Sequence, residues 1–175
     1  MARLPYPDIE HPDFRDMAER VRRERGGKVG NVFRMLMHSP PAMNGWMEFF
    51  TAIRQRCDLD ARSRELAILR VAVINGADYE FGAHAPVAMA AGVTEAQIEA
   101  LRRGETPDTF TDCDRAVLDF TTAMTRDITV PDAVFAAVRR HFDDRRLVEL
   151  TLTIGGYNLV SRFLVAMQVD HDPLP

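Results

Sequence analysis

The sequence predicts an all-α protein, and three observations lead to this prediction. Capping residues and Gly or Pro boundaries divide the 175-residue chain into segments of helical length. Only residues 66–74 have the branched apolar residues of a buried strand, and no other run could pair with them. The composition, with 46% apolar and 27% charged residues, is that of one globular domain of ordinary size. We therefore expect residues 66–74 to form a helix that is buried on most sides.

The first half of the chain contains four expected helices. The first ends at a pair of glycines, and Ser39 followed by Pro40 is an N-cap with proline at the first helical position. Asp60 can cap the fourth helix, and Asn75-Gly76 breaks it. These helices are expected over residues 12–25, 31–38, 40–56 and 61–74.

The second half contains five more expected helices. Asp78 can cap the first of them, and two capping boxes, Thr94 with Gln97 and Thr111 with Asp114, open the next two. Helices are expected over residues 78–92, 94–104, 111–126, 131–142 and 144–169, and the glycines at 155 and 156 can kink the last one.

The expected organisation is a helical arm, a main domain and a short tail. The arm covers residues 1–28, the main domain residues 29–170 and the tail residues 171–175. A dense apolar region between Met35 and Phe50 has the helical spacing of a core, and such residues also suit a subunit interface.

Charge and cysteine content restrict the partners and the compartment. The formal net charge is −4, so no overall positive field attracts nucleic acid. The basic residues between Arg20 and Lys28 are interrupted by glutamate and are interpreted as a solvated helix face. We recognise no signal peptide and no run of about 18 apolar residues, so no membrane partner is expected. With only two distant cysteines, Cys57 and Cys113, the expected location is the cytoplasm, with reduced thiols.

The most informative stretch lies in the middle of the chain. Glu80 and His84 are four residues apart and share one helix face. Glu65 begins the preceding buried helix, and the break at Asn75-Gly76 lets the two helices fold against each other. Two carboxylates and an imidazole can then meet and divide the roles of acid and base. The simpler interpretation is a surface pair at helical spacing, with Glu65 favoured by its helix dipole.

The same residues carry a resemblance to a known family. Glu65, the apolar helix that follows it, and then Asn75, Ala77, Glu80 and His84 stand at the signature positions of the carboxymuconolactone decarboxylase family, which includes the alkylhydroperoxidase D-like proteins. The likeness continues in residues 91–94 and 156–158 and covers roughly residues 30–170. In the peroxidase branch of that family, cysteines fill the positions of Ala77 and Glu80. This sequence is similar instead to members with Tyr-Glu before the His.

The resemblance implies a compact multi-helix bundle, a homo-oligomer and an enzyme without cofactor or metal. The reaction that names the family removes a carboxylate from a small γ-lactone in the breakdown of aromatic compounds, which makes this chain a candidate carboxy-lyase. Glu80 and His84 are then the candidates for proton transfer, and Glu65 orients His84. The candidate substrate-binding residues are Tyr79, Asn75 and Arg70. For Arg70 an ion pair with Glu65 or Glu149 competes with that role.

Three other functions remain open at this point. A peroxidase or antioxidant role is disfavoured because a carboxylate cannot replace a thiolate as the nucleophile toward a hydroperoxide. A metal site could use Glu65, Glu80 and His84, although no His-Glu-x-x-His pattern supports it. A non-catalytic oligomer that binds a small ligand would use the same residues.

Overall fold

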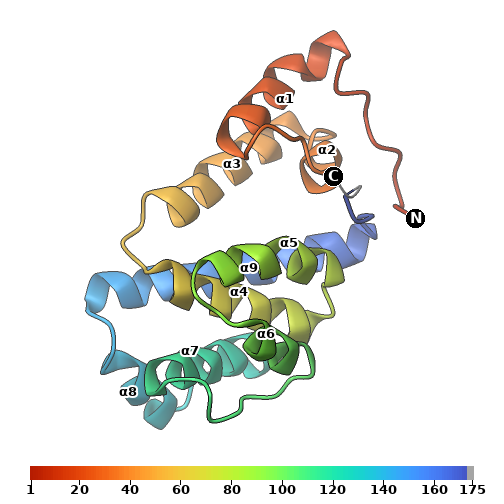
Figure 1. Cartoon of the computed structure of the whole chain (residues 1–175). Coiled ribbons are helices and arrows are strands. Elements are labelled where there is room, and N and C mark those ends of the chain that lie inside the picture. Colours follow the sequence, from red (N-terminus) through yellow and green to blue (C-terminus); the bar gives the residue numbers. More distant parts are fainter. Residues whose placement is uncertain (173–175) are drawn as a thin grey trace. The chain divides into compact units, whose positions relative to one another are not determined.

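The computed structural model describes residues 1–172, which form helices joined by short loops (Figure 1). No strand occurs among these residues, which confirms the predicted all-α fold. The helices are α1 (Pro12–Glu24), α2 (Asn31–Leu36), α3 (Pro40–Gln55), α4 (Ala61–Asn75), α5 (Asp78–Ala90), α6 (Glu95–Arg102), α7 (Asp112–Thr122), α8 (Asp132–Arg139) and α9 (Asp144–Met167), and a π-helix, η1 (Ala123–Asp127), continues α7. Part of the expected tail, residues 173–175, lies outside the described residues.

The helices fall into two compact units, which are described separately. The central unit is Cys57–Phe163 and contains α4 to α8 with most of α9. Among the described residues, the terminal unit is Met1–Arg56 together with residues 164–172. The predicted boundary after residue 28 lies inside the terminal unit, between α1 and α2.

The terminal unit joins the two ends of the described chain. The Asn31 side-chain amide donates hydrogen bonds to the backbone carbonyls of Asp170 at 3.1 Å and His171 at 3.2 Å. The Tyr6 hydroxyl donates to the Asp170 carboxylate at 3.3 Å. Most of the apolar region between Met35 and Phe50 is buried, as expected for a core; its buried members are Met35, Leu36, Met37, Met43, Met47 and Phe50.

Helix α4 is the centre of the central unit. Leu66, Ala67, Ile68 and Leu69 are all completely buried. Consecutive residues point in different directions around a helix, so α4 is enclosed by protein on every side. It packs against α5 and α7. This enclosure explains why the sequence of α4 has the continuous apolar character of a buried strand.

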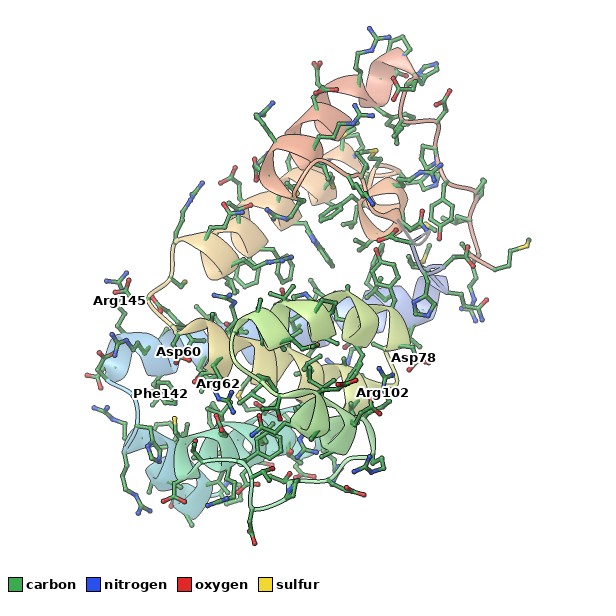
Figure 2. All side chains as sticks on the ribbon, viewed as in Figure 1. Asp60, Arg62, Asp78, Arg102, Phe142 and Arg145 are labelled. Carbon is green, nitrogen blue, oxygen red and sulfur yellow. The ribbon has the colours of Figure 1, made fainter. Side chains whose placement is uncertain are left out.

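Both ends of α4 agree with the caps predicted from the sequence, whereas the start of α5 does not. The Asp60 side chain accepts a hydrogen bond from the Ser63 backbone N–H at 2.8 Å, as predicted. Gly76 ends α4 with a φ of 64°, a left-handed conformation that glycine adopts without steric cost. The prediction that Asp78 caps α5 is wrong, because the N-cap is Ala77 and Asp78 is the first helical residue (Figure 2). There its carboxylate still suits the positive end of the helix dipole.

Helix α9 is continuous over 24 residues and has no interruption at Gly155 and Gly156. By length and mean hydropathy it could cross a membrane, although the sequence led us to expect no such segment. Half of its qualifying window is buried inside the protein. The apolar character of that half is explained by packing within the domain.

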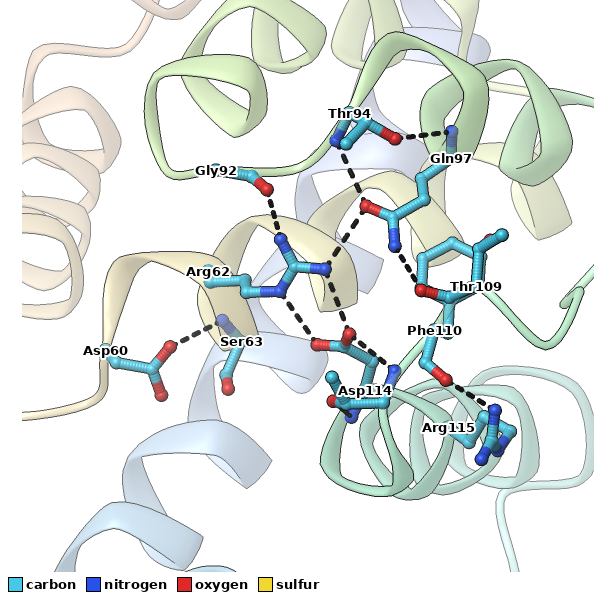
Figure 3. Close-up of polar contacts among 11 residues, drawn as sticks. Asp60, Arg62, Ser63, Gly92, Thr94, Gln97, Thr109, Phe110, Asp114 and Arg115 are labelled. Carbon is cyan, nitrogen blue, oxygen red and sulfur yellow. Dashed lines mark hydrogen bonds and ion pairs between the residues drawn. The ribbon is translucent and has the colours of Figure 1, made fainter.

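Arg62 on α4 connects the capping boxes of α6 and α7 (Figure 3). Its guanidinium donates to both carboxylate oxygens of Asp114, at 3.0 and 2.9 Å, and to Gln97 Oε1 at 3.2 Å. Gln97 and Asp114 also accept hydrogen bonds from the backbone N–H groups of Thr94 and Thr111, each at 3.0 Å. Both predicted capping boxes are thus confirmed, and one arginine fixes them to α4.

We expect Arg62→Met to lower the free energy of unfolding by about 2–3 kcal/mol, because it leaves the buried Asp114 carboxylate without its bidentate partner. Urea denaturation at pH 7 measures this difference. Arg103→Met is the matched control, since Arg103 pairs with Glu105 on the exposed surface and should leave stability nearly unchanged. Equal effects of the two substitutions would contradict the role given to Arg62.

Candidate active site

The candidate site lies where α5 packs against α4 in the central unit. Glu65 is in the second turn of α4, and Glu80 and His84 are one turn apart on α5. The chain reverses at Gly76, whose left-handed conformation separates the two helices. The structure therefore brings together the three residues that the sequence singled out.

His84 lies between the two glutamates. Its Nδ1 is 2.6 Å from Glu65 Oε2, and its Nε2 is 3.0 Å from Glu80 Oε1. All three residues are buried, with exposed fractions of 4% for His84, 0% for Glu65 and 6% for Glu80. Both ring nitrogens face carboxylate oxygens, an arrangement that suits an imidazolium with its two N–H donors.

Arg64 extends this arrangement to four charges. Its Nε lies 3.0 Å from Glu65 Oε1, the oxygen that His84 does not use. The order of charge is then Arg64 positive, Glu65 negative, His84 positive and Glu80 negative. With all four groups ionised, the net charge of the cluster is zero, which is the condition that buried charges require.

The pKa values follow from burial and from these contacts. Burial alone would lower the pKa of His84 and raise that of Glu65, since it disfavours the charged form of each. The opposite charges outweigh burial: the attraction of Glu80 and the hydrogen bond to Glu65 raise the pKa of His84 to about 9. The hydrogen bond from His84 lowers the pKa of Glu65. At neutral pH the centre of the site is an imidazolium held between carboxylates.

Sequence reasoning missed two side chains of this cluster, Arg64 and Tyr157. The Tyr157 ring, on α9, stands edge-on to the His84 imidazole, with ring centres 5.2 Å apart and an angle of 86°. It is buried and helps to fix the plane of the imidazole. One signal in the sequence could have identified Tyr157. It belongs to the segment 156–158, which carries part of the family resemblance but was given no functional role.

Asn75 lies at the end of α4 and contacts α9. Its amide nitrogen is 3.0 Å from Asn158 Oδ1 and 2.6 Å from Ser161 Oγ. An amide has two N–H donors, so both are directed toward α9. Tyr79, the other expected substrate-binding residue near Glu80, is half-buried on α5.

Arg70 is separated from the cluster. It follows Glu65 by five residues on α4, which places it about 140° away around the helix. Its guanidinium donates to the Gly104 carbonyl at 3.3 Å and to the Thr106 hydroxyl. The expected ion pair with Glu65 or Glu149 is wrong: Glu65 is bound by Arg64 and His84, and Glu149 accepts hydrogen bonds at the turn before α4 and from α9. The desolvation of Arg70 lowers its pKa.

The two cysteines are free thiols. Burial, followed by the nearby Glu149 carboxylate, raises the pKa of Cys57. Burial and the Asp60 carboxylate raise the pKa of Cys113. Thiols with raised pKa values hold little thiolate at neutral pH and are weak nucleophiles.

The side chains of the cluster suit charge pairing better than metal binding. Metal-ligating histidine offers a nitrogen lone pair, whereas both nitrogens of His84 are directed at carboxylates and its raised pKa keeps them protonated. Over residues 1–172, no group of three or more His, Cys, Asp or Glu has the arrangement of a metal site.

Comparison with known proteins points to one superfamily. The model of the Carboxymuconolactone decarboxylase family matches residues 40–123. The uncharacterized protein YdfG of Bacillus subtilis is 29% identical over 123 residues, which are 69% of this chain and 82% of YdfG.

Two solved structures share the fold. ATU0492 of Agrobacterium tumefaciens, a protein of unknown function proposed for antioxidant defence as AhpD, is 26% identical, with a TM-score of 0.74 over 80% of this chain and 97% of that one. A peroxidase-related protein of Ralstonia eutropha with an alkylhydroperoxidase AhpD core is 21% identical, with a TM-score of 0.84 over 98% of this chain and 92% of that one.

The raised pKa of His84 predicts how stability depends on pH. The pKa of His84 is about 9 in the folded protein and 6.5 when the ring has no such contacts, as in the unfolded chain. The imidazolium therefore stabilises the fold fully below pH 6.5. This stabilisation is lost as the pH rises through 9. We expect NMR of the His84 ring nitrogens to show both protonated at pH 7. Glu65→Gln should lower the His84 pKa, and a ring that is neutral at pH 7 in the unsubstituted protein would contradict this description.

Proposed function

Because this chain belongs to the carboxymuconolactone decarboxylase and AhpD-like superfamily, we propose that it is a cofactor-independent enzyme that transfers a proton to a small organic acid. The reaction that fits best is decarboxylation of a carboxylated lactone of the kind formed in aromatic catabolism. The observation that carries this proposal is the buried hydrogen-bonded row of Glu65, His84 and Glu80.

Decarboxylation places a specific demand on this row. When carbon dioxide leaves, the electron pair of the broken C–C bond moves into the conjugated carbonyl, and a carbon atom then takes up a proton. An imidazolium with a pKa of about 9 carries that proton at neutral pH. We assign the proton to the Glu80–His84 pair, with Glu65 holding the ring in place. After transfer, His84 is neutral and recovers its proton from water.

The charge balance of the cluster removes one objection to this substrate. Two adjacent carboxylates would repel an anionic substrate. Here His84 and Arg64 neutralise Glu80 and Glu65 through contacts of 3.0 Å or less. A substrate carboxylate therefore approaches a neutral cluster, and the imidazolium is the positive charge nearest to Glu80.

The proposal is tested with carboxymuconolactone as the probe substrate, following its ultraviolet absorbance and the release of carbon dioxide. We expect Glu80→Gln and His84→Gln each to lower kcat by about 10²–10⁴-fold, the usual contribution of general acid–base catalysis. Glu99→Gln, which alters an exposed glutamate on α6, is the control and should retain full activity. Wild-type kcat in Glu80→Gln would exclude the assigned role.

A peroxidase function is the alternative, because the names of both similar structures refer to peroxidase or antioxidant proteins. The thiol positions of that branch hold Ala77 and Glu80 in this chain. The remaining thiols, Cys57 and Cys113, have raised pKa values and lie on other segments. These features favour proton transfer over thiol chemistry.

We expect no turnover of cumene hydroperoxide with dithiothreitol as reductant, since no low-pKa thiol is available to attack the peroxide. The assay compares the unsubstituted protein with the Cys57→Ser, Cys113→Ser double variant. Both should match the rate without enzyme. Turnover that disappears in the double variant would establish a peroxidase that uses other thiols.

A further inference from the structure

Helix α9 carries large apolar side chains on two opposite sides, and only one of these sides is buried. Leu150, Ile154 and Tyr157 form part of the buried side. On the other side, Val148, Leu152 and Leu159 have exposed fractions of 57%, 48% and 55%. Large apolar side chains on a helix are normally covered by a partner, and these three have none within the central unit.

Within the central unit, the exposed large apolar residues of α9 form one line with Gly155, which we call the α9 stripe: Val148, Leu152, Gly155 and Leu159. At 100° per residue these four positions fall within an arc of about 60° and extend along about 17 Å of helix. The stripe is therefore narrow and straight, as in helices that pair along their length.

We propose that the α9 stripe is the contact between two copies of this chain, which pair across a two-fold axis with their α9 helices antiparallel. The spacing within the stripe is four, three and four residues, and it reads the same in both directions. An axis that passes between Leu152 and Gly155 places Leu152 of each copy against Gly155 of the other. It also places Val148 against Leu159, so that one surface is complementary to itself, as a two-fold interface requires.

Gly155 makes the close approach possible. An added Cβ at this position would meet no atom within 4 Å, so the surface is open there. In the antiparallel pair this space receives the Leu152 side chain of the other copy. A glycine in the interior of a helix lowers the stability of the helix by about 1 kcal/mol relative to alanine. Close contact between two helices is a structural reason for a glycine at this position.

The charges at the two ends of the stripe are complementary in the same arrangement. Asp144 lies one turn before Val148, and Arg162 lies one turn after Leu159, both on the same side of the line. In the antiparallel pair, Arg162 of each copy lies beside Asp144 of the other. Asp144 also pairs with Arg139 of its own chain at 2.5 Å, so its carboxylate joins one arginine from each copy. A bilayer would instead have to accept the exposed Arg162 at the edge of the apolar stripe, which is unfavourable. A second copy is therefore the better partner.

This proposal places the subunit contact away from the region expected from sequence. Most of the apolar side chains between Met35 and Phe50 are buried in the structure and cannot supply an exposed surface. The residues of the α9 stripe are all exposed and belong to the central unit.

Sedimentation velocity of the full chain between about 1 and 100 µM tests the proposal, over the affinity range of modest interfaces. We expect a dimer or a multiple of it. Gly155→Arg should weaken association at least tenfold, because it fills the space for Leu152 and brings two like charges together. Gly45→Arg, at an exposed helical glycine on α3 that is equally open, is the matched control and should associate normally. Thermal unfolding of both variants separates lost association from lost folding.

A charge exchange tests the antiparallel orientation. Arg162→Asp alone should weaken association, and Arg162→Asp combined with Asp144→Arg should restore it. A wild-type monomer at all concentrations, or unchanged association in Gly155→Arg, would overturn the proposal. Failure of the double exchange to restore association would overturn the antiparallel pairing. If the wild-type protein floats with phosphatidylcholine vesicles and Gly155→Arg does not, the α9 stripe binds a membrane surface, and the proposed contact between two copies is overturned.

Discussion

A buried imidazolium held between two carboxylates is the interaction on which the central unit depends. Charged groups are costly to bury unless each has a partner in contact. His84 contacts Glu80 at 3.0 Å within α5 and Glu65 of α4 at 2.6 Å. The Glu65 contact forms only when α4 and α5 pack in one register. Arg64 then completes the balance at Glu65. The packing of two helices and the state of the site are thus set by the same four charges.

The rest of the central unit is arranged around α4, which supplies apolar contacts on all sides and polar contacts at its first turns. Arg62 fixes α6 and α7 through their capping boxes, and Arg64 and Glu65 face the site. Three residues of one short segment therefore connect α4 both to the helices packed around it and to the candidate active site. Because adjacent residues on a helix diverge by about 100°, they reach different neighbours without competing.

Much of this arrangement could be predicted because the signals are local. Asp60, Gly76 and the capping boxes act on their own helices, and the four-residue spacing of Glu80 and His84 fixes their common face. Asp78 was misplaced by one position because Ala77 already occupies the cap. The partners of Asn75 and Arg70 come from α9 and from the loop after α6, which lie far away in sequence. No local pattern encodes such contacts, and the edge-on Tyr157 was missed for the same reason.

The division of the chain has a consequence for the order in which its contacts form during folding. The terminal unit needs both ends, since Asn31 on α2 binds the backbone at Asp170 and His171. The central unit is one uninterrupted segment, Cys57–Phe163. The Glu65–His84 contact joins residues 19 apart in the chain, whereas the Asn31 contacts join residues 139 and 140 apart. Because closing a longer loop costs more conformational entropy, we expect the buried charges of the central unit to come together before α2 binds the C-terminal segment.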